Sequence, residues 1–167
     1  CPRQEFLIPR VEGEIAFVLN KDLQGPGVTE IDVIGSTEGI LPAIEIVDSR
    51  IRDWKIKLAD TVADNASSAR IVLGSRMYNL MDYDLRSLGM FIEKNGELVN
   101  SGTGIEVLGN PVVSVAWLAN KLSEFGICLK AGEIILSGAI TAAVNAEKGD
   151  VFNLTFDRLG NVSVKFS

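Results

Sequence analysis

The sequence predicts an α+β fold that is mostly β, in which a largely antiparallel or mixed sheet rolls on itself and few helices accompany it. Three observations support this class: strand-like runs outnumber amphipathic segments, one hairpin signal is strong, and one helix has clear start and stop signals. The 167 residues have the size of one domain, and 47% of them are hydrophobic, which is enough for a core. We therefore treat residues 1–167 as a single domain.

Strand-like runs recur along the chain between turn-forming residues. Alternating apolar and polar side chains are typical of half-buried strands, and short apolar runs are typical of buried ones. Residues 60–68 are ambiguous in secondary structure. The expected strands cover residues 11–19, 40–49, 70–74, 133–138, 150–156 and 162–166.

A hairpin is expected over residues 88–104, because Asn95-Gly96 stands between two strand-like runs. An Asn-Gly pair suits the positive φ angles of a type I′ turn. A loop over residues 21–30 contains Gly-Pro-Gly, and Thr29 with Asp32 can start a short helix after it.

The clearest helix is expected over residues 111–125, with Asn110 as N-cap and Pro111 as its first residue. We expect Trp117 to belong to the core. Four apolar residues form a stripe that should pack on the sheet, namely Val115, Leu118, Leu122 and Phe125.

Composition limits the possible partners. The net charge of −6 argues against nucleic acid and anionic membranes. No apolar run reaches membrane-spanning length, and no signal peptide is recognisable. Cys1 and Cys128 are too few for a disulfide framework, so a cytoplasmic location is expected. The chain starts "CPRQEFLIPRVEGE" without Met, and we expect an N-terminal region to precede it.

The carboxylates of the first two strands are unusual. Glu12 and Glu14 are two residues apart, so they share one face of a strand whose other residues are mostly apolar. Glu45 lies inside the apolar run "PAIEIVD". A buried carboxylate is unfavourable unless it is paired, protonated or bound to metal. The chain has no histidine, so a metal site would have to use oxygen ligands and take a hard cation. The alternatives are a solvated strand face for the pair, and an ion pair with Arg50 or Arg52 for Glu45.

Four segments carry a resemblance to a known family: "PRVEGEIAFVL" (9–19), "PAIEIVDSRIRDWKIKLADTVADNASSARIVLG" (42–74), "LGMFIEKNGELVNSGTGIEVLGNPVVSVAWLANKL" (88–122) and "LKAGEIILSGAITAAVNAEKGD" (129–150). They resemble the 2-keto-4-pentenoate hydratase and 4-oxalocrotonate decarboxylase family, within the fumarylacetoacetate-hydrolase fold superfamily. The likeness covers nearly the whole chain. It implies a catalytic domain that binds Mg²⁺ or Mn²⁺ through Glu12, Glu14 and Glu45.

The same resemblance favours further polar residues near a substrate. Lys57 and Asp64 are candidates for catalysis, with Lys55 an alternative to Lys57. Surface positions and ordinary turn capping are the alternatives for this region. Arg50 and Arg52 are substrate candidates that can equally pair with Asp48 or Asp53. The candidates for substrate binding are Asn65, Ser67, Ser137, the Gly138 amide and Thr141, with Ser68 in the same block.

The implied reaction is hydration of 2-hydroxypenta-2,4-dienoate to 4-hydroxy-2-oxopentanoate in the meta-cleavage catabolism of aromatic compounds. The nearest rival is a decarboxylase of the 4-oxalocrotonate type, and carbon–carbon bond hydrolysis is a weaker one. A third reading is a non-catalytic partner in a hydratase–decarboxylase complex. The resemblance also implies a homo-oligomer.

Overall fold

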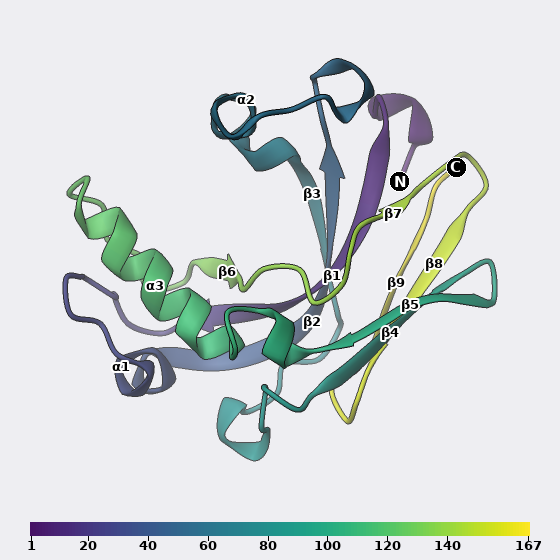
Figure 1. Cartoon of the computed structure of the whole chain (residues 1–167). Helices are drawn as coiled ribbons and strands as arrows, with labels where there is room; N and C mark the ends of the chain where they lie inside the picture. Colours follow the sequence, from purple (N-terminus) through teal and green to yellow (C-terminus); the bar gives the residue numbers. More distant parts are fainter.

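The computed structural model describes residues 1–167 as two antiparallel sheets (Figure 1). The five-stranded sheet has the order β3-β2-β1-β6, and β7 also pairs with β1. Its strands are β1 (Pro9–Leu19), β2 (Thr37–Asp48), β3 (Ser68–Leu73), β6 (Ile134–Leu136) and β7 (Val144–Asn145).

The four-stranded sheet has the order β5-β4-β8-β9. Its strands are β4 (Gly89–Lys94), β5 (Glu97–Thr103), β8 (Val151–Phe156) and β9 (Gly160–Lys165). All strand pairs in both sheets are antiparallel. The expected α+β class, mostly β with a curled sheet, is confirmed, and antiparallel pairing is the correct choice of the two considered.

Three α-helices accompany the sheets: α1 (Glu30–Gly35), α2 (Leu58–Ala63) and α3 (Pro111–Ser123). Short 3₁₀ turns add η1 (Arg3–Glu5), η2 (Arg52–Trp54), η3 (Asn65–Ser67), η4 (Leu80–Asp82) and η5 (Gly104–Glu106). The predicted caps are confirmed, because Asn110 accepts a hydrogen bond from the Val112 N–H and Thr29 forms a capping box with Asp32. None of the helices combines the length and the apolar character needed to cross a membrane.

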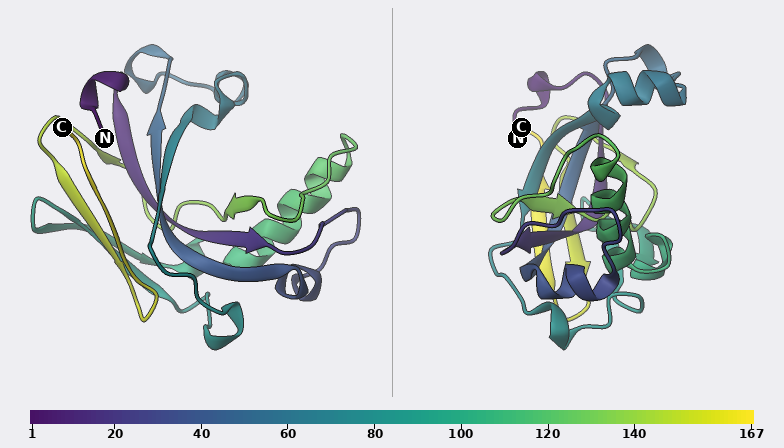
Figure 2. Two further views of the ribbon diagram at one scale, coloured as in Figure 1. Left: turned by 180° about the vertical axis from the view of Figure 1, so that it is seen from behind. Right: turned by 90° about the vertical axis from the view of Figure 1, so that its left-hand side faces the viewer.

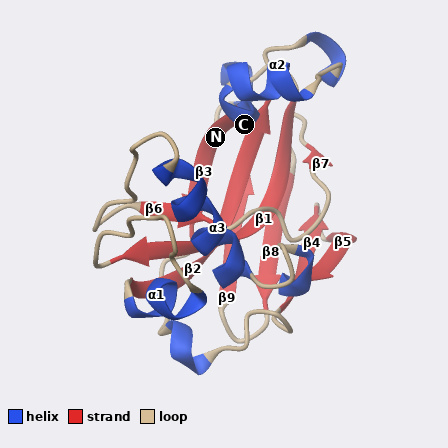
Figure 3. Cartoon of the chain, turned by 60° about the vertical axis from the view of Figure 1, so that its left-hand side comes forward, coloured by secondary structure: helices blue, strands red, loops and turns tan.

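The two sheets meet at an angle, as the views in Figure 2 show. Helices α1 and α3 lie near one end of β1 and β2, and α2 lies near the other (Figure 3). The chain termini lie side by side, where the Ser167 N–H donates to the Cys1 carbonyl at 2.9 Å. Because α2 lies at the opposite end of β1 and β2 from α1 and α3, its segment is separate from the other helices. We call residues 51–67, which include η2, α2 and η3, the arm.

The main core lies between the sheets, and β1 turns its odd-numbered residues into it. A Cβ added at Gly13 would meet Met90 of β4 and Leu154 of β8. The even-numbered residues of β1 therefore point away from the second sheet. The largest fully buried side chains are Phe17, Phe152, Phe156, Phe166, Ile15, Leu19, Ile40, Ile44, Ile46, Ile92, Ile140 and Leu154.

The predicted apolar stripe of α3 is partly wrong. Val115 is buried, but Phe125 is 69% exposed and Trp117, expected in the core, is 56% exposed. Leu118 and Leu122 are half-buried against the core. The remaining buried residues of α3 are Pro111, Val112, Ala116 and Ala119.

The reason is the loop before α1, which packs closely on α3. The Asn120 side chain accepts from the Val28 N–H and donates to the Val28 carbonyl, both at 2.9 Å. A Cβ on Gly25 would lie 2.8 Å from the Asn120 Cα. The contact turns the small residues of α3 inward and leaves Trp117 outside.

Candidate metal centre

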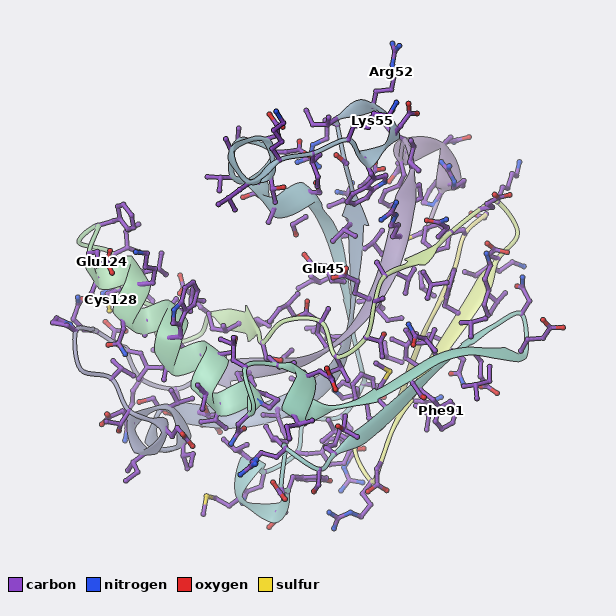
Figure 4. All side chains as sticks on the ribbon, in the orientation of Figure 1. Glu45, Arg52, Lys55, Phe91, Glu124 and Cys128 are labelled. Atoms are coloured by element: carbon purple, nitrogen blue, oxygen red, sulfur yellow. The ribbon has the colours of Figure 1, made fainter.

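The pairing of β1 with β2 brings the three glutamates together. Glu12 lies directly opposite Glu45, and Glu14 lies opposite Ala43. Side chains alternate along a strand, so all three carboxylates leave the same face. One oxygen from each lies within 4.8 Å of the others. The predicted convergence is confirmed, and Figure 4 shows Glu45 on the side of the sheet toward α2 and α3.

The three carboxylates lie close together, and burial makes the charged form unfavourable for Glu14 above all and for Glu12 to a lesser degree. Glu14 is 2% exposed. Burial raises its pKa to about 8, opposed by a hydrogen bond from Gly138 and reinforced by Glu45 and Glu12. Burial and the charge of Glu45 raise the pKa of Glu12 to about 7, with Arg10 opposing them. The group therefore favours either protonation or a cation.

Glu14 is held in place by the segment that follows β6. The Gly138 N–H donates to Glu14 Oε2 at 2.6 Å. Gly138 has φ of +111°, a backbone conformation that favours glycine. The Ser137 N–H bonds the Ile15 carbonyl, and the Ile140 N–H bonds the Gly13 carbonyl. The Gly138 N–H, which we predicted to bind substrate, instead donates to the Glu14 carboxylate and orients it.

The donor set fits a hard divalent cation. Three carboxylates without histidine or cysteine are the oxygen ligands that Mg²⁺ and similar ions take. A cation would relieve both the mutual repulsion and the burial that raise the two pKa values. Glu12, Glu14 and Glu45 are the residues that would hold it.

Asp64, a residue of the arm, is bonded to Arg50, which lies between the end of β2 and the arm. The Arg50 Nε lies 2.6 Å from Asp64 Oδ1, and the Ser67 hydroxyl donates to Oδ2 at 2.9 Å. Burial works to raise the pKa of Asp64, but these bonds and the Arg50 N–H hold it below its usual range. The Asp64 carboxylate therefore remains charged and fixes the arm to the end of β2. Arg50 pairs with Asp64, rather than with Glu45 or Asp48.

The other predicted residues of the arm are on its surface or in its turns. Lys57 is exposed, and its backbone N–H bonds Asp60 at the start of α2. Lys55 pairs with Asp53 at 3.4 Å, and Figure 4 shows Lys55 and Arg52 at the outer end of the arm. Asn65 is exposed and has φ of 54°. Lys57 is thus the lysine of the two that is free of an ion pair.

The segment after β6 contacts Glu14 through the Gly138 amide and also carries the polar side chains of Ser137 and Thr141. The Ser137 hydroxyl oxygen is buried and has no hydrogen-bond partner. The Ser137 carbonyl accepts from the Ser114 hydroxyl of α3 at 2.5 Å. The Thr141 hydroxyl donates only to the Ala142 carbonyl, at 3.4 Å. Both hydroxyls therefore keep capacity for another partner, although their role in binding substrate remains a prediction.

Arg10 is a residue of this region that the sequence interpretation missed. It shares the face of Glu12 and Glu14, because it is two residues before Glu12 on β1. The Arg10 Cζ lies 4.2 Å from the centre of the Trp54 ring, which comes from the arm. The even-numbered spacing 10, 12, 14 was the signal that could have identified it.

A separate hollow of about 530 Å³ lies on the outer side of the four-stranded sheet, between β5 and β8. Phe91 at its centre is 39% exposed and is labelled in Figure 4. None of its lining residues belongs to the predicted site.

The chain is thus a curled antiparallel β-sheet protein with a candidate metal site of three carboxylates on the pair formed by β1 and β2. Residues 2–167 match the family described as fumarylacetoacetate (FAA) hydrolase C-terminal, and the chain belongs to this family.

Two curated relatives of the chain are dienoate hydratases. The chain is 52% identical over 159 residues to a 2-hydroxyhexa-2,4-dienoate hydratase of Comamonas testosteroni, covering 95% of this chain and 60% of that protein. It is 58% identical over 127 residues to a 2-hydroxypent-2,4-dienoate hydratase of Pseudomonas putida, covering 75% of this chain and 57% of that protein. The chain thus spans about three-fifths of the length of the curated relatives it matches.

A solved structure gives the same relationship in three dimensions. The 4-oxalocrotonate decarboxylase from Pseudomonas putida G7, complexed with magnesium and adipate, superposes with a TM-score of 0.95 at 44% identity. The match covers 98% of this chain and 62% of that chain. The chain therefore shares much of its sequence with hydratases and its fold with a decarboxylase.

Proposed function

We propose that this chain is the metal-binding catalytic domain of a hydratase that converts 2-hydroxypenta-2,4-dienoate to 4-hydroxy-2-oxopentanoate in the catabolism of aromatic compounds. The observation that carries the proposal is the convergence of Glu12, Glu14 and Glu45 within 4.8 Å, in a chain whose relatives include dienoate hydratases. Such an enzyme is a lyase.

The proposed chemistry divides between a cation and the residues of this chain. A divalent cation would supply Lewis-acid stabilisation of the negative charge that develops on a substrate oxygen. Glu12, Glu14 and Glu45 would hold it, and the Gly138 N–H orients the Glu14 carboxylate by donating to its Oε2. The hydroxyls of Ser137 and Thr141 are suited to donate to a substrate carboxylate, and Asn65 and Ser67 remain candidates on the arm.

The hydration also needs a group that moves protons between carbon atoms and water. The chain has no histidine to do so. Of the two candidates, Asp64 is already engaged by Arg50 and Ser67, which suits an anchor better than an acid. We therefore assign proton transfer to Lys57, whose ammonium makes no ion pair, and give Asp64 a positioning role.

Decarboxylation of 4-oxalocrotonate is the second candidate function. The 44% identity to a decarboxylase of known structure favours keeping it. Both reactions call for the same carboxylate group, so the identity of the product distinguishes them.

Further properties belong to the same proposal. An oxygen-only donor set accommodates Mg²⁺ and Mn²⁺ alike. We also infer a homo-oligomer, a possible complex with a related decarboxylase or hydratase, and a cytoplasmic location. The acidic net charge supports a small-molecule substrate over nucleic acid or membrane as partner.

The first experiment measures cation binding. Mn²⁺ and Mg²⁺ are titrated into the purified chain and into Glu12→Gln and Glu45→Gln, with Glu97→Gln as a matched control on the exposed hairpin. We expect the two site variants to lose at least tenfold in affinity and the control to lose nothing, because hard cations bind amides weakly. Equal affinities in all four proteins would exclude the site.

The second experiment identifies the reaction. The chain is incubated with 2-hydroxypenta-2,4-dienoate and, separately, with 4-oxalocrotonate, with Mg²⁺ or with chelator, and the products are identified by NMR. Formation of 4-hydroxy-2-oxopentanoate that stops in chelator supports the hydratase. Release of CO₂ from 4-oxalocrotonate without hydration supports the decarboxylase instead.

A further inference from the structure

Arg10 forms no ion pair in the structure, although it lies near enough to Glu12 to lower the pKa of that carboxyl. Its Nε is buried and has no hydrogen-bond partner, and the guanidinium takes part in no ion pair or hydrogen bond. Its neighbours across the sheet are Val47 on β2 and Asn145 on β7, neither of which is charged. A buried polar nitrogen that is left unpaired destabilises a fold. Packing alone therefore does not explain an arginine at this position.

The guanidinium is nevertheless held firmly. Its flat face stacks on the Trp54 ring, at 4.2 Å from Cζ to the ring centre. Trp54 is itself fixed, because its indole N–H donates to the Ile8 carbonyl at 3.1 Å. Stacking uses the face of a guanidinium and leaves the N–H groups at its edge available. Arg10 is thus oriented in advance, with donors that lack an acceptor.

The position of Arg10 indicates what the acceptor is. It follows the same strand face as Glu12 and Glu14, one side-chain repeat beyond Glu12, which is about 7 Å along the strand. An anion lying over the glutamate group and its cation would reach the Arg10 edge at that spacing. End-on pairing of a carboxylate uses the two terminal nitrogens, which make no hydrogen bond in this structure and, unlike Nε, are not buried.

We propose that Arg10, stacked on Trp54, is a carboxylate-binding residue of this site and pairs end-on, through its two terminal nitrogens, with the carboxylate of a 2-oxo or 2-hydroxy acid substrate. The proposal rests on the proposed function and adds a specificity residue to it. Trp54 acts as a positioning residue, and through it the arm helps to orient the bound acid.

The experiment compares two probes that differ in one charge. In the presence of Mg²⁺, 2-oxopentanoate and its neutral analogue 2-oxopentanamide are titrated into the wild-type chain, Arg10→Gln and Arg10→Lys. Arg76→Gln is the matched control, because Arg76 also stacks on an aromatic ring, that of Tyr78, at 5.0 Å. Binding is followed by calorimetry, and by Trp54 fluorescence in a Trp117→Phe background.

We expect Arg10→Gln to weaken binding of 2-oxopentanoate roughly ten- to hundredfold, the usual effect of losing a charged hydrogen-bond pair. Binding of the amide should change less than threefold. Arg10→Lys retains the charge but offers no pair of parallel N–H donors, so its loss should be intermediate. It also serves as the test if Arg10→Gln does not fold. The Arg76→Gln chain should bind like the wild type.

Several results would overturn the proposal. Unchanged binding of 2-oxopentanoate to both Arg10 variants removes the carboxylate role and leaves the proposed function standing. Equal weakening of both probes means that Arg10 does not recognise charge. A parallel loss of Mg²⁺ affinity, measured without probe, makes Arg10 a structural support of the glutamates. Absence of Mg²⁺-dependent binding of 2-oxopentanoate to the wild type overturns the proposed function as well.

Discussion

Replacing Glu14 by Gln should make the cation-free chain more stable, although it damages the site. The pKa of Glu14 is raised from its ordinary value of 4.5 to about 8. Between these values the folded chain binds more protons than the unfolded chain, so stability falls as the pH rises through this interval. At pH 7 Glu14 is still protonated in the folded chain but ionised in the unfolded chain. Because pH 7 lies 2.5 units above the ordinary pKa of 4.5, this difference lowers the free energy of unfolding by on the order of 3 kcal/mol.

An amide at this position removes that contribution. Its oxygen can still accept the Gly138 N–H, so that donor keeps its partner, and the neighbouring Glu45 carboxylate can accept the N–H groups of the new amide. We therefore expect Glu14→Gln to raise the free energy of unfolding in chelator by on the order of 1 kcal/mol at pH 5.5 and by several kcal/mol at pH 8. The lower pH is chosen to stay above the isoelectric point near 4.7.

The assay is urea unfolding of the wild type, Glu14→Gln and the exposed-site control Glu97→Gln at both pH values, with chelator and with excess Mg²⁺. In Mg²⁺ the order should reverse, because bound cation stabilises the wild type by mass action and the variant much less. A variant no more stable than wild type at pH 8 in chelator would refute the reasoning. It would mean that Glu14 does not carry the burial penalty assigned to it.

Three further changes test the fold around the site. Asn110→Ala should lower the free energy of unfolding by about 1 kcal/mol, because α3 loses its N-cap; an unchanged urea midpoint would contradict the assigned cap. Gly104→Ala should severely destabilise the chain, because the new Cβ would overlap a backbone carbonyl, whereas Gly89→Ala has open space and should change little. Equal unfolding midpoints for the two would contradict the packing. Asp64→Asn should speed proteolysis within residues 51–67 while leaving the Mg²⁺ affinity intact, and unchanged cleavage there would show that the ion pair is not the anchor.

Local signals account for what the sequence could predict. Asn95 and Gly96 take the expected positive φ values of 56° and 84°, and the caps of α1 and α3 form as the residues indicate. The shared face of Glu12 and Glu14 follows from the two-residue period of a strand. Each of these features depends on residues within a few positions of one another, so a single sequence contains the information.

Features that depend on distant packing could not be predicted in the same way. The inward face of α3 is set by the loop at Gly25 and Val28, about 90 residues earlier, as the Asn120 hydrogen bonds show. The two-residue strand β7 exists only because β1 offers it an edge. The stack of Arg10 on Trp54 joins β1 to the arm, and neither residue carries a local sign of the other.

Strand β1 explains how a site with this much buried charge is compatible with a stable fold. Its odd-numbered residues, such as Val11 and Ile15, are fully buried, and they contribute hydrophobic stabilisation that is independent of pH and cations. Its even-numbered face carries Arg10, Glu12 and Glu14, where unpaired charge is unfavourable. Because both faces share one backbone, the core fixes the position of the carboxylates even while they repel one another. The site can therefore remain assembled without its cation, which is why we expect Glu14→Gln to show its effect on stability and on binding with opposite signs.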